Sequence, residues 1–142
     1  AGLPNAEGIR FRSIPSTDLV SRAQYYLEHP PNDLLFVNFG RSGNSSETVG
    51  TLRAIEVLAP SLPTLNITCN SNSAMAKSSI GQSILPPDAC HDAGFAMTSS
   101  FSTMLLTALS IFDTDADARS HMRQLVSMQK PYCRYLTVKS AD

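Results

Sequence analysis

The strongest constraint on the fold of this chain is a continuous apolar segment followed by a polar loop and an amphipathic stretch. Residues 34–39 are mostly apolar and are bounded by turn residues, the pattern of a strand buried in a parallel sheet. A helix is expected from Glu47, because apolar side chains then recur every third position as far as Leu58. A strand and a helix that follow each other in this order favour an α/β fold.

The same alternation continues along the chain. Further strands are expected at residues 9–14, 64–69 and 83–85, separated by prolines and polar turns. Residues 98–112 are apolar nearly all round and predict a central packed helix. Three further helices are expected, beginning at Ser16 or Thr17, at Ala74 and at Thr114. The order predicts a parallel sheet with helices on its faces.

Composition excludes several classes of protein. The 142 residues suffice for one domain or most of one, and 42% hydrophobic residues can form a core. A formal net charge of -1 lacks the basic excess typical of nucleic-acid binders. The longest apolar run, residues 104–112, is too short to span a membrane. Neither nucleic acid nor a membrane is therefore an expected partner.

The ends of the chain and its cysteines add two expectations. The first residues show no secretory signal pattern, and the chain begins with Ala1, so it is either processed or a piece of a longer protein. Cys69, Cys90 and Cys133 form an odd set without Cys-x-x-Cys spacing, which argues against a disulfide framework or a zinc site. Free thiols suit a reducing, cytoplasmic location.

The polar loop over residues 40–48 is the first candidate for a binding site. Ligands of open α/β sheets bind at the carboxyl ends of the strands, where this loop would lie. Its two glycines allow a sharp turn, and a helix N-terminus with free amide groups favours an anion. The loop is neither a Walker loop nor Gly-x-Gly-x-x-Gly. The polar side chains that could contact a phosphate are those of Arg41, Ser42, Asn44, Ser45, Ser46 and Thr48.

A purely structural interpretation of this loop also stands. Asn44 followed three residues later by Glu47 resembles a capping box at the start of the helix. A capped helix leaves other donors free, so both interpretations are compatible.

Four segments resemble a known family. Residues 39–48, with Asn44 and Ser45 after the glycine, resemble the phosphosugar loop of the sugar isomerase (SIS) domain. The form with Asn-Ser resembles one branch, the tagatose-6-phosphate ketose/aldose isomerases, also described as galactosamine-6-phosphate deaminase/isomerases. Residues 15–20, 67–70 and 91–100 resemble other segments of that branch in the same order. The resemblance covers roughly residues 10–112.

The resemblance implies a fold and a function. The fold would be a three-layer, flavodoxin-like SIS domain over residues 1–130 that lacks its first strand, followed by an unassigned tail over residues 131–142. The function would be phosphosugar binding in an aldose-ketose isomerase or deaminase that acts on an amino sugar or hexose 6-phosphate, without metal or cofactor. The full-length protein would be a homo-oligomer. Alternatives are a non-catalytic module that senses a phosphosugar, and an inactive fragment.

The resemblance also implies roles for single residues. Ser42, Asn44 and Ser45 would bind the phosphate, with Arg41 and Thr48 assisting. The family isomerises sugars by acid–base transfer through an enediol, but no residue of this chain matches its catalytic glutamate. The remaining candidates lie before the long helix: His91 for proton transfer or loop orientation, and Asp92, Thr98, Ser99 and Ser100 for the pocket or for caps.

Two further expectations come from the residue types. Cys69 stands at a strand end and is expected to be a small buried hydrophobe instead of a nucleophile. Met97, Phe101 and Met104 are expected to fill the core.

Overall fold

The computed structural model describes residues 10–30, 33–94 and 96–112. The chain divides into two compact units, of which one is formed by residues 11–105. The other comprises residues 1–10 and 106–142, and its described part is Arg10 with the later turns of the last helix. The sheet and the candidate site belong to the first unit.

A parallel sheet of three strands forms the centre of this unit, within the described residues. The strands are β1 (Phe36–Gly40), β2 (Thr64–Thr68) and β3 (Gln82–Ile84), in the spatial order β1-β2-β3. Both neighbouring pairs are parallel, and Gly40 at the end of β1 is in register with Thr68 at the end of β2. The loops that follow β1 and β2 therefore start at the same edge. The α/β fold with a parallel sheet is confirmed. The expectation that the first of these strands is buried is wrong for the described structure: β1 is partly buried and Phe39 is 51% exposed, because β1 stands at the end of the strand order with one neighbouring strand among the described residues.

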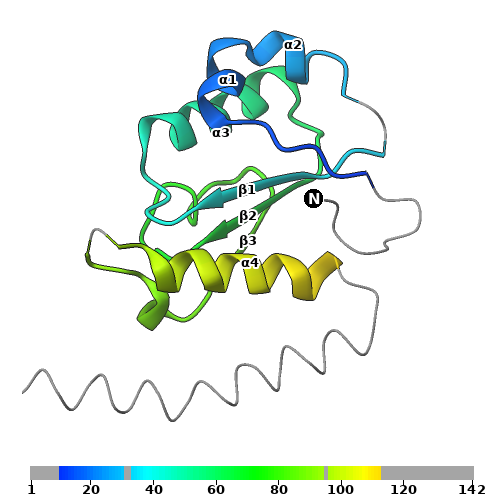
Figure 1. Ribbon diagram of the computed structural model, residues 1–142. Helices are drawn as coiled ribbons and strands as arrows, with labels where there is room; N and C mark the ends of the chain where they lie inside the picture. Colours follow the sequence, from blue (N-terminus) through cyan, green and yellow to red (C-terminus); the bar gives the residue numbers. More distant parts are fainter. Residues whose placement is uncertain (1–9, 31–32, 95, 113–142) are drawn as a thin grey trace, which may run out of the picture. The chain divides into compact units, whose positions relative to one another are not determined.

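Three helices pack together beside this sheet (Figure 1). They are α1 (Ser16–Ser21), α2 (Ala23–Leu27) and α3 (Ser46–Leu58). α3 begins one residue before the expected start and ends where it was expected, because Pro60 and Pro63 follow. The apolar stripe of α3 contributes to a core of fully or nearly buried side chains: Leu19, Leu27, Ile55, Ala59 and Leu62.

Two asparagines connect the strands through their side chains. Asn38 on β1 and Asn66 on β2 are in register, and Asn38 Nδ2 donates to Asn66 Oδ1 at 2.8 Å. Asn66 Nδ2 in turn donates to the Ile80 carbonyl oxygen at 2.8 Å. Asn66 is fully buried, so both of its polar atoms need these partners. The mostly apolar strands therefore include two asparagines whose side chains are hydrogen-bonded across the sheet.

Two expected elements do not form. Residues 10–14, the described part of the first expected strand, have no strand structure. A strand requires a neighbouring strand in the sheet, and the described sheet consists of β1, β2 and β3 alone. Residues 74–77, at the start of the expected short helix, form turns instead. There the Ser73 hydroxyl accepts from the Ala76 amide at 3.0 Å, which satisfies the backbone locally without a helix.

The last described helix, α4 (Thr98–Phe112), has the expected bounds but not the expected burial. Phe101 is 66% exposed, Met97 just before the helix is 49% exposed, and Met104 is partly buried. The only buried side chain of this helix is Ser100. The prediction that these apolar residues fill the core is wrong for Met97 and Phe101 in the described structure. A helix forms through its own backbone bonds, whereas burial requires neighbours on several sides.

None of the helices in the described part of the chain is long and apolar enough to cross a membrane. The expected helix after Thr114 and the tail over residues 131–142 lie outside the described residues.

Candidate functional site

The candidate site is the loop that connects β1 to α3. It turns at Gly43, whose φ of 60° lies in the left-handed region that favours glycine. Gly43 is buried against the loop that follows β2, and a Cβ atom there would meet the side chains of Ser73 and Thr68. The glycine therefore permits both the turn and the close contact of the two loops.

The backbone carbonyl groups of this loop are held by the loop after β2. Three consecutive carbonyl oxygens accept hydrogen bonds from that neighbouring segment, which covers residues 68–75. The pairs are Thr68 Oγ1 to Arg41 at 3.5 Å, Asn70 Nδ2 to Ser42 at 3.0 Å, and the Met75 amide to Gly43 at 3.1 Å. The carbonyl oxygens of residues 41–43, which carry partial negative charge, therefore point toward the neighbouring segment.

The amide groups of the same loop remain available as donors. No acceptor is found among the described residues for the amides of Gly43 and Ser45. The amides of Ser46 and Glu47, in the first turn of α3, are of the kind that a helix leaves without an intrahelical partner. Free amides at a helix N-terminus favour an anion. The arrangement can therefore accept a phosphate group.

Ser45, and not Asn44, is the N-cap of α3. The Ser45 hydroxyl accepts from the Thr48 amide at 3.2 Å and lies 2.9 Å from the Thr48 hydroxyl. Asn44 Oδ1 instead accepts from the amide of Ala74 at 2.7 Å, in the neighbouring loop. The expected capping box between Asn44 and Glu47 is therefore wrong, because tertiary contact with Ala74 takes the asparagine oxygen.

Arg41 connects the loop to the segment before α4. Its Nη1 atom donates to the backbone carbonyl of Asp92 at 2.7 Å. The Asp92 carboxylate accepts from the amide and the hydroxyl of Ser100, at 2.8 and 2.7 Å. Asp92 therefore accepts from an amide in the first turn of α4. Of the pocket role and the capping role that the sequence suggested for Asp92, this contact agrees with the capping role. The Ser100 hydrogen bonds, the amide first, lower the pKa of the Asp92 carboxyl group.

This lowered pKa predicts how acid affects stability. A carboxylate whose folded-state pKa is depressed stabilises the fold above its ordinary pKa of about 4 and loses that contribution as pH falls through the depressed value. The difference in urea midpoint between the wild type and Asp92→Asn should therefore be largest near neutral pH and shrink below about pH 4. A constant difference between pH 7 and pH 2.5 would contradict this role of the charge.

His91 precedes Asp92 and does not itself make the bond to Arg41. Its Nδ1 atom is buried and has no hydrogen-bond partner within the described residues. Proton transfer by His91 stays a prediction, as does a pocket role for Thr98 and Ser99, which are exposed in the first turn of α4. Cys69 is 1% exposed, and burial raises the pKa of its thiol. This agrees with a buried hydrophobe and not a nucleophile.

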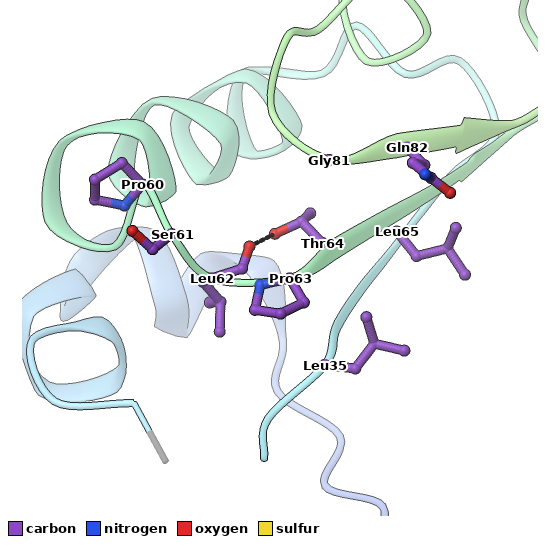
Figure 2. Close-up of a pocket in the computed structure, with 9 residues that line it drawn as sticks. All are labelled: Leu35, Pro60, Ser61, Leu62, Pro63, Thr64, Leu65, Gly81 and Gln82. Carbon is purple, nitrogen blue, oxygen red and sulfur yellow. Dashed lines mark hydrogen bonds between the residues drawn. The ribbon is translucent and has the colours of Figure 1, made fainter. Parts of the chain in front are cut away.

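A hollow of about 430 Å³ lies at the opposite edge of the sheet (Figure 2). Leu35 lies before β1, Pro60 and Pro63 before β2, and Gln82 at the start of β3, so the lining comes from the amino ends of the strands. The side chains that line it are uncharged. It has no feature of an anion site, and the loop after β1 remains the candidate.

Within the described residues, no group of three or more His, Cys, Asp or Glu side chains is placed so that it could hold a metal ion. The chemistry available at the loop is hydrogen bonding to an anion.

Comparisons with known proteins agree with the resemblance. No protein-family model matches the chain. It is 40% identical over 114 residues, 78% of its length, to a D-galactosamine-6-phosphate deaminase from Escherichia coli. A second deaminase of that name, from a Shewanella species, is 36% identical over 134 residues. The crystal structure of tagatose-6-phosphate ketose/aldose isomerase from Escherichia coli superposes on 75% of the chain with a TM-score of 0.67 and 40% identity.

The chain is homologous to this branch of the sugar isomerases. The resemblance inferred from the loop motifs is thereby confirmed, as is the SIS type of fold. The chain spans about a third of these relatives: 29% of the Escherichia coli deaminase, 33% of the Shewanella deaminase and 30% of the solved isomerase.

The loop after β2 is the part of the candidate site that sequence reasoning missed. Residues 70–73 form a polar turn in the sequence, and Asn70 also ends a segment that resembles the family, but neither observation indicated a contact with the loop after β1. In the structure Asn70 donates to the Ser42 carbonyl oxygen and Ser73 lies against Gly43. The available signal was their position, because they follow a buried strand that neighbours β1 in the sheet. Polar residues there lie at the ligand-binding edge of a parallel sheet.

Proposed function

We propose that the loop after β1 binds the phosphate of a sugar 6-phosphate, and that the chain is a phosphosugar-binding part of an aldose-ketose isomerase or deaminase. The observation that best supports this is the orientation of the loop backbone. Three carbonyl groups, those of residues 41–43, accept bonds from the neighbouring loop. Amide groups of the same loop and of the α3 N-terminus are left to face an anion.

The side chains of the loop would add donors around these amides. The hydroxyl of Ser42 can donate to a phosphate oxygen, and so can one of the Ser45 and Thr48 hydroxyls, because the other donates within the bond between these two groups. Asn44 retains its Nδ2 group, since only its Oδ1 atom is bonded to Ala74. Arg41 uses Nη1 for Asp92, and its guanidinium has further donors that could approach the phosphate.

The relatives support the choice of ligand class. The names of the proteins reported above refer to galactosamine 6-phosphate and tagatose 6-phosphate, so an amino sugar or hexose 6-phosphate is the class we propose. Because these proteins are about three times as long as this chain, the proposal for this chain itself concerns binding.

Thermal unfolding in the presence of ligands tests this proposal. We expect galactosamine 6-phosphate or tagatose 6-phosphate to stabilise the chain by about 2.7 kcal/mol at 100 times its dissociation constant. Inorganic phosphate should stabilise it less, because it lacks the sugar. The double variant Ser42→Ala/Ser45→Ala should lose the ligand-dependent shift, since it removes two hydroxyl donors from the loop.

Ser61→Ala is the control, because it removes an exposed hydroxyl at the opposite edge of the sheet and leaves the loop unchanged. It should keep the shift. Each variant is compared with its own ligand-free form, since loss of the Ser45 cap by itself lowers stability by about 1 kcal/mol. A folded wild type that no phosphosugar stabilises would refute the proposal, and a shift that survives in the double variant would place the site elsewhere.

A further inference from the structure

We propose that Asn70 is a positioning residue of the anion loop: it fixes the peptide group between Ser42 and Gly43 so that the Gly43 amide faces the phosphate. This inference rests on the proposed phosphate site and adds to it a residue from the loop after β2. Asn70 lies outside the motif that identifies the phosphosugar loop.

Both polar atoms of the Asn70 side chain are engaged. Its Oδ1 atom accepts from the backbone amide of Asn72 at 3.0 Å, and its Nδ2 atom donates to the Ser42 carbonyl oxygen at 3.0 Å. The Asn70 amide donates to the hydroxyl of the fully buried Thr68 at 3.3 Å. Because the oxygen is fixed by an N–H group, the amide nitrogen must be the atom that faces Ser42.

The bond to Ser42 determines where the next amide points. The carbonyl of Ser42 and the N–H of Gly43 belong to one trans peptide group, so they point in opposite directions. Asn70 holds the carbonyl toward the loop after β2, and the Gly43 N–H is thereby directed away from that loop. No acceptor for this N–H is found among the described residues, which leaves it free for an anion.

This peptide group needs an external constraint because of the glycine. Gly43 can adopt left-handed and right-handed backbone conformations with little difference in energy, so the peptide before it could rotate and present its carbonyl to the ligand. A carbonyl oxygen there would repel a phosphate. Preorganised donors bind an anion more tightly than donors that must first reorient.

Asn70→Asp is the sharpest test, because the new side chain has the same shape. It keeps an oxygen for the Asn72 amide but places a second oxygen against the Ser42 carbonyl. In an amide NMR titration of the full chain with galactosamine 6-phosphate, we expect Asn70→Asp to bind at least about tenfold more weakly than the wild type. The Gly43 amide signal, which should shift on binding in the wild type, should no longer respond in the variant.

Asn72→Asp is the matched control. It introduces the same charge two residues away, at an exposed position, and leaves the Asn70 to Ser42 bond intact. We expect its affinity to stay within about twofold of the wild type, since a solvated charge contributes little. Asn70→Ala is the second variant, which removes the donor without adding charge and should weaken binding by roughly fivefold to tenfold. It decides the question if circular dichroism shows that Asn70→Asp is unfolded.

The outcomes separate this inference from the proposed function. If the wild type and Asn72→Asp bind while both Asn70 variants are weakened and lose the Gly43 response, the positioning role is supported. If a folded Asn70 variant binds as tightly as the wild type, the positioning role is wrong and the phosphate site stands. If Asn72→Asp is weakened as much as Asn70→Asp, charge explains the loss in Asn70→Asp, and Asn70→Ala decides: weakened binding of this uncharged variant supports the positioning role, and binding like the wild type overturns it. A folded wild type that does not bind refutes the phosphate site itself.

Discussion

Replacing Gly43 with alanine should destabilise the folded chain by at least about 2 kcal/mol. Two physical effects add. The φ of 60° at this residue disfavours any side chain with a Cβ atom, and the new atom would meet the Ser73 side chain, including its Cβ at 2.7 Å. Ser73 is fully buried, so it cannot move aside without disturbing the loop after β2. Urea unfolding of the two proteins measures the difference.

Gly94→Ala is the control for this substitution. A Cβ atom at Gly94 would find no atom within 4 Å, so its stability should change by less than about 0.5 kcal/mol. If Gly43→Ala is as stable as Gly94→Ala, the loop does not turn at Gly43 as described. Because the same turn directs the amides toward the anion site, Gly43→Ala should also abolish the phosphosugar-dependent thermal shift.

Replacing Asn66 with alanine should cost about 2–4 kcal/mol of stability. Asn66 is fully buried and connects two groups: it accepts from Asn38 and donates to the Ile80 carbonyl. Without it, a donor and an acceptor near the middle of the sheet lose their partners, and each unsatisfied buried group costs about 1–3 kcal/mol. The free energy of unfolding in urea is again the measurement.

A double-mutant cycle with Asn38→Ala tests the pair itself. Asn38 is partly buried, so its loss should cost less than that of Asn66. The two losses should be non-additive by about 0.5–1.5 kcal/mol, because both remove the same hydrogen bond. Additive losses would mean that the side-chain bond between β1 and β2 contributes nothing measurable.

The order of strands and helices could be predicted because it depends on local patterns. The apolar run over residues 34–39 indicates the strand β1, and the three-residue periodicity within Ser46–Leu58 indicates the helix α3 and its buried side. The same reasoning failed at residues 10–14, where a strand needs a partner, and at Phe101, which is 66% exposed. Strand pairing and burial both depend on what the rest of the chain places nearby.

The site shows the same division. Its position after an apolar strand, its glycines and its hydroxyl side chains are visible in the sequence. The branch of relatives was identified from the resemblance of four segments, of which this loop is one. Which residue caps α3 was not visible. Asn44 and Ser45 are both good N-cap residues, and contact with Ala74 removes Asn44 from that role.

The sequence by itself determined the α/β alternation and the polar loop after the first strand of the sheet, because these follow from residue type and spacing along the chain. It also identified the homologous branch, through the resemblance of four segments to known relatives. Only the tertiary structure decided the direction of the loop backbone. The carbonyl of Ser42 turns toward Asn70, which is 28 positions further along the chain, and no local preference of a glycine-containing loop selects that direction. A hydrogen bond between distant residues selects it, and such a bond exists only once the strands have paired.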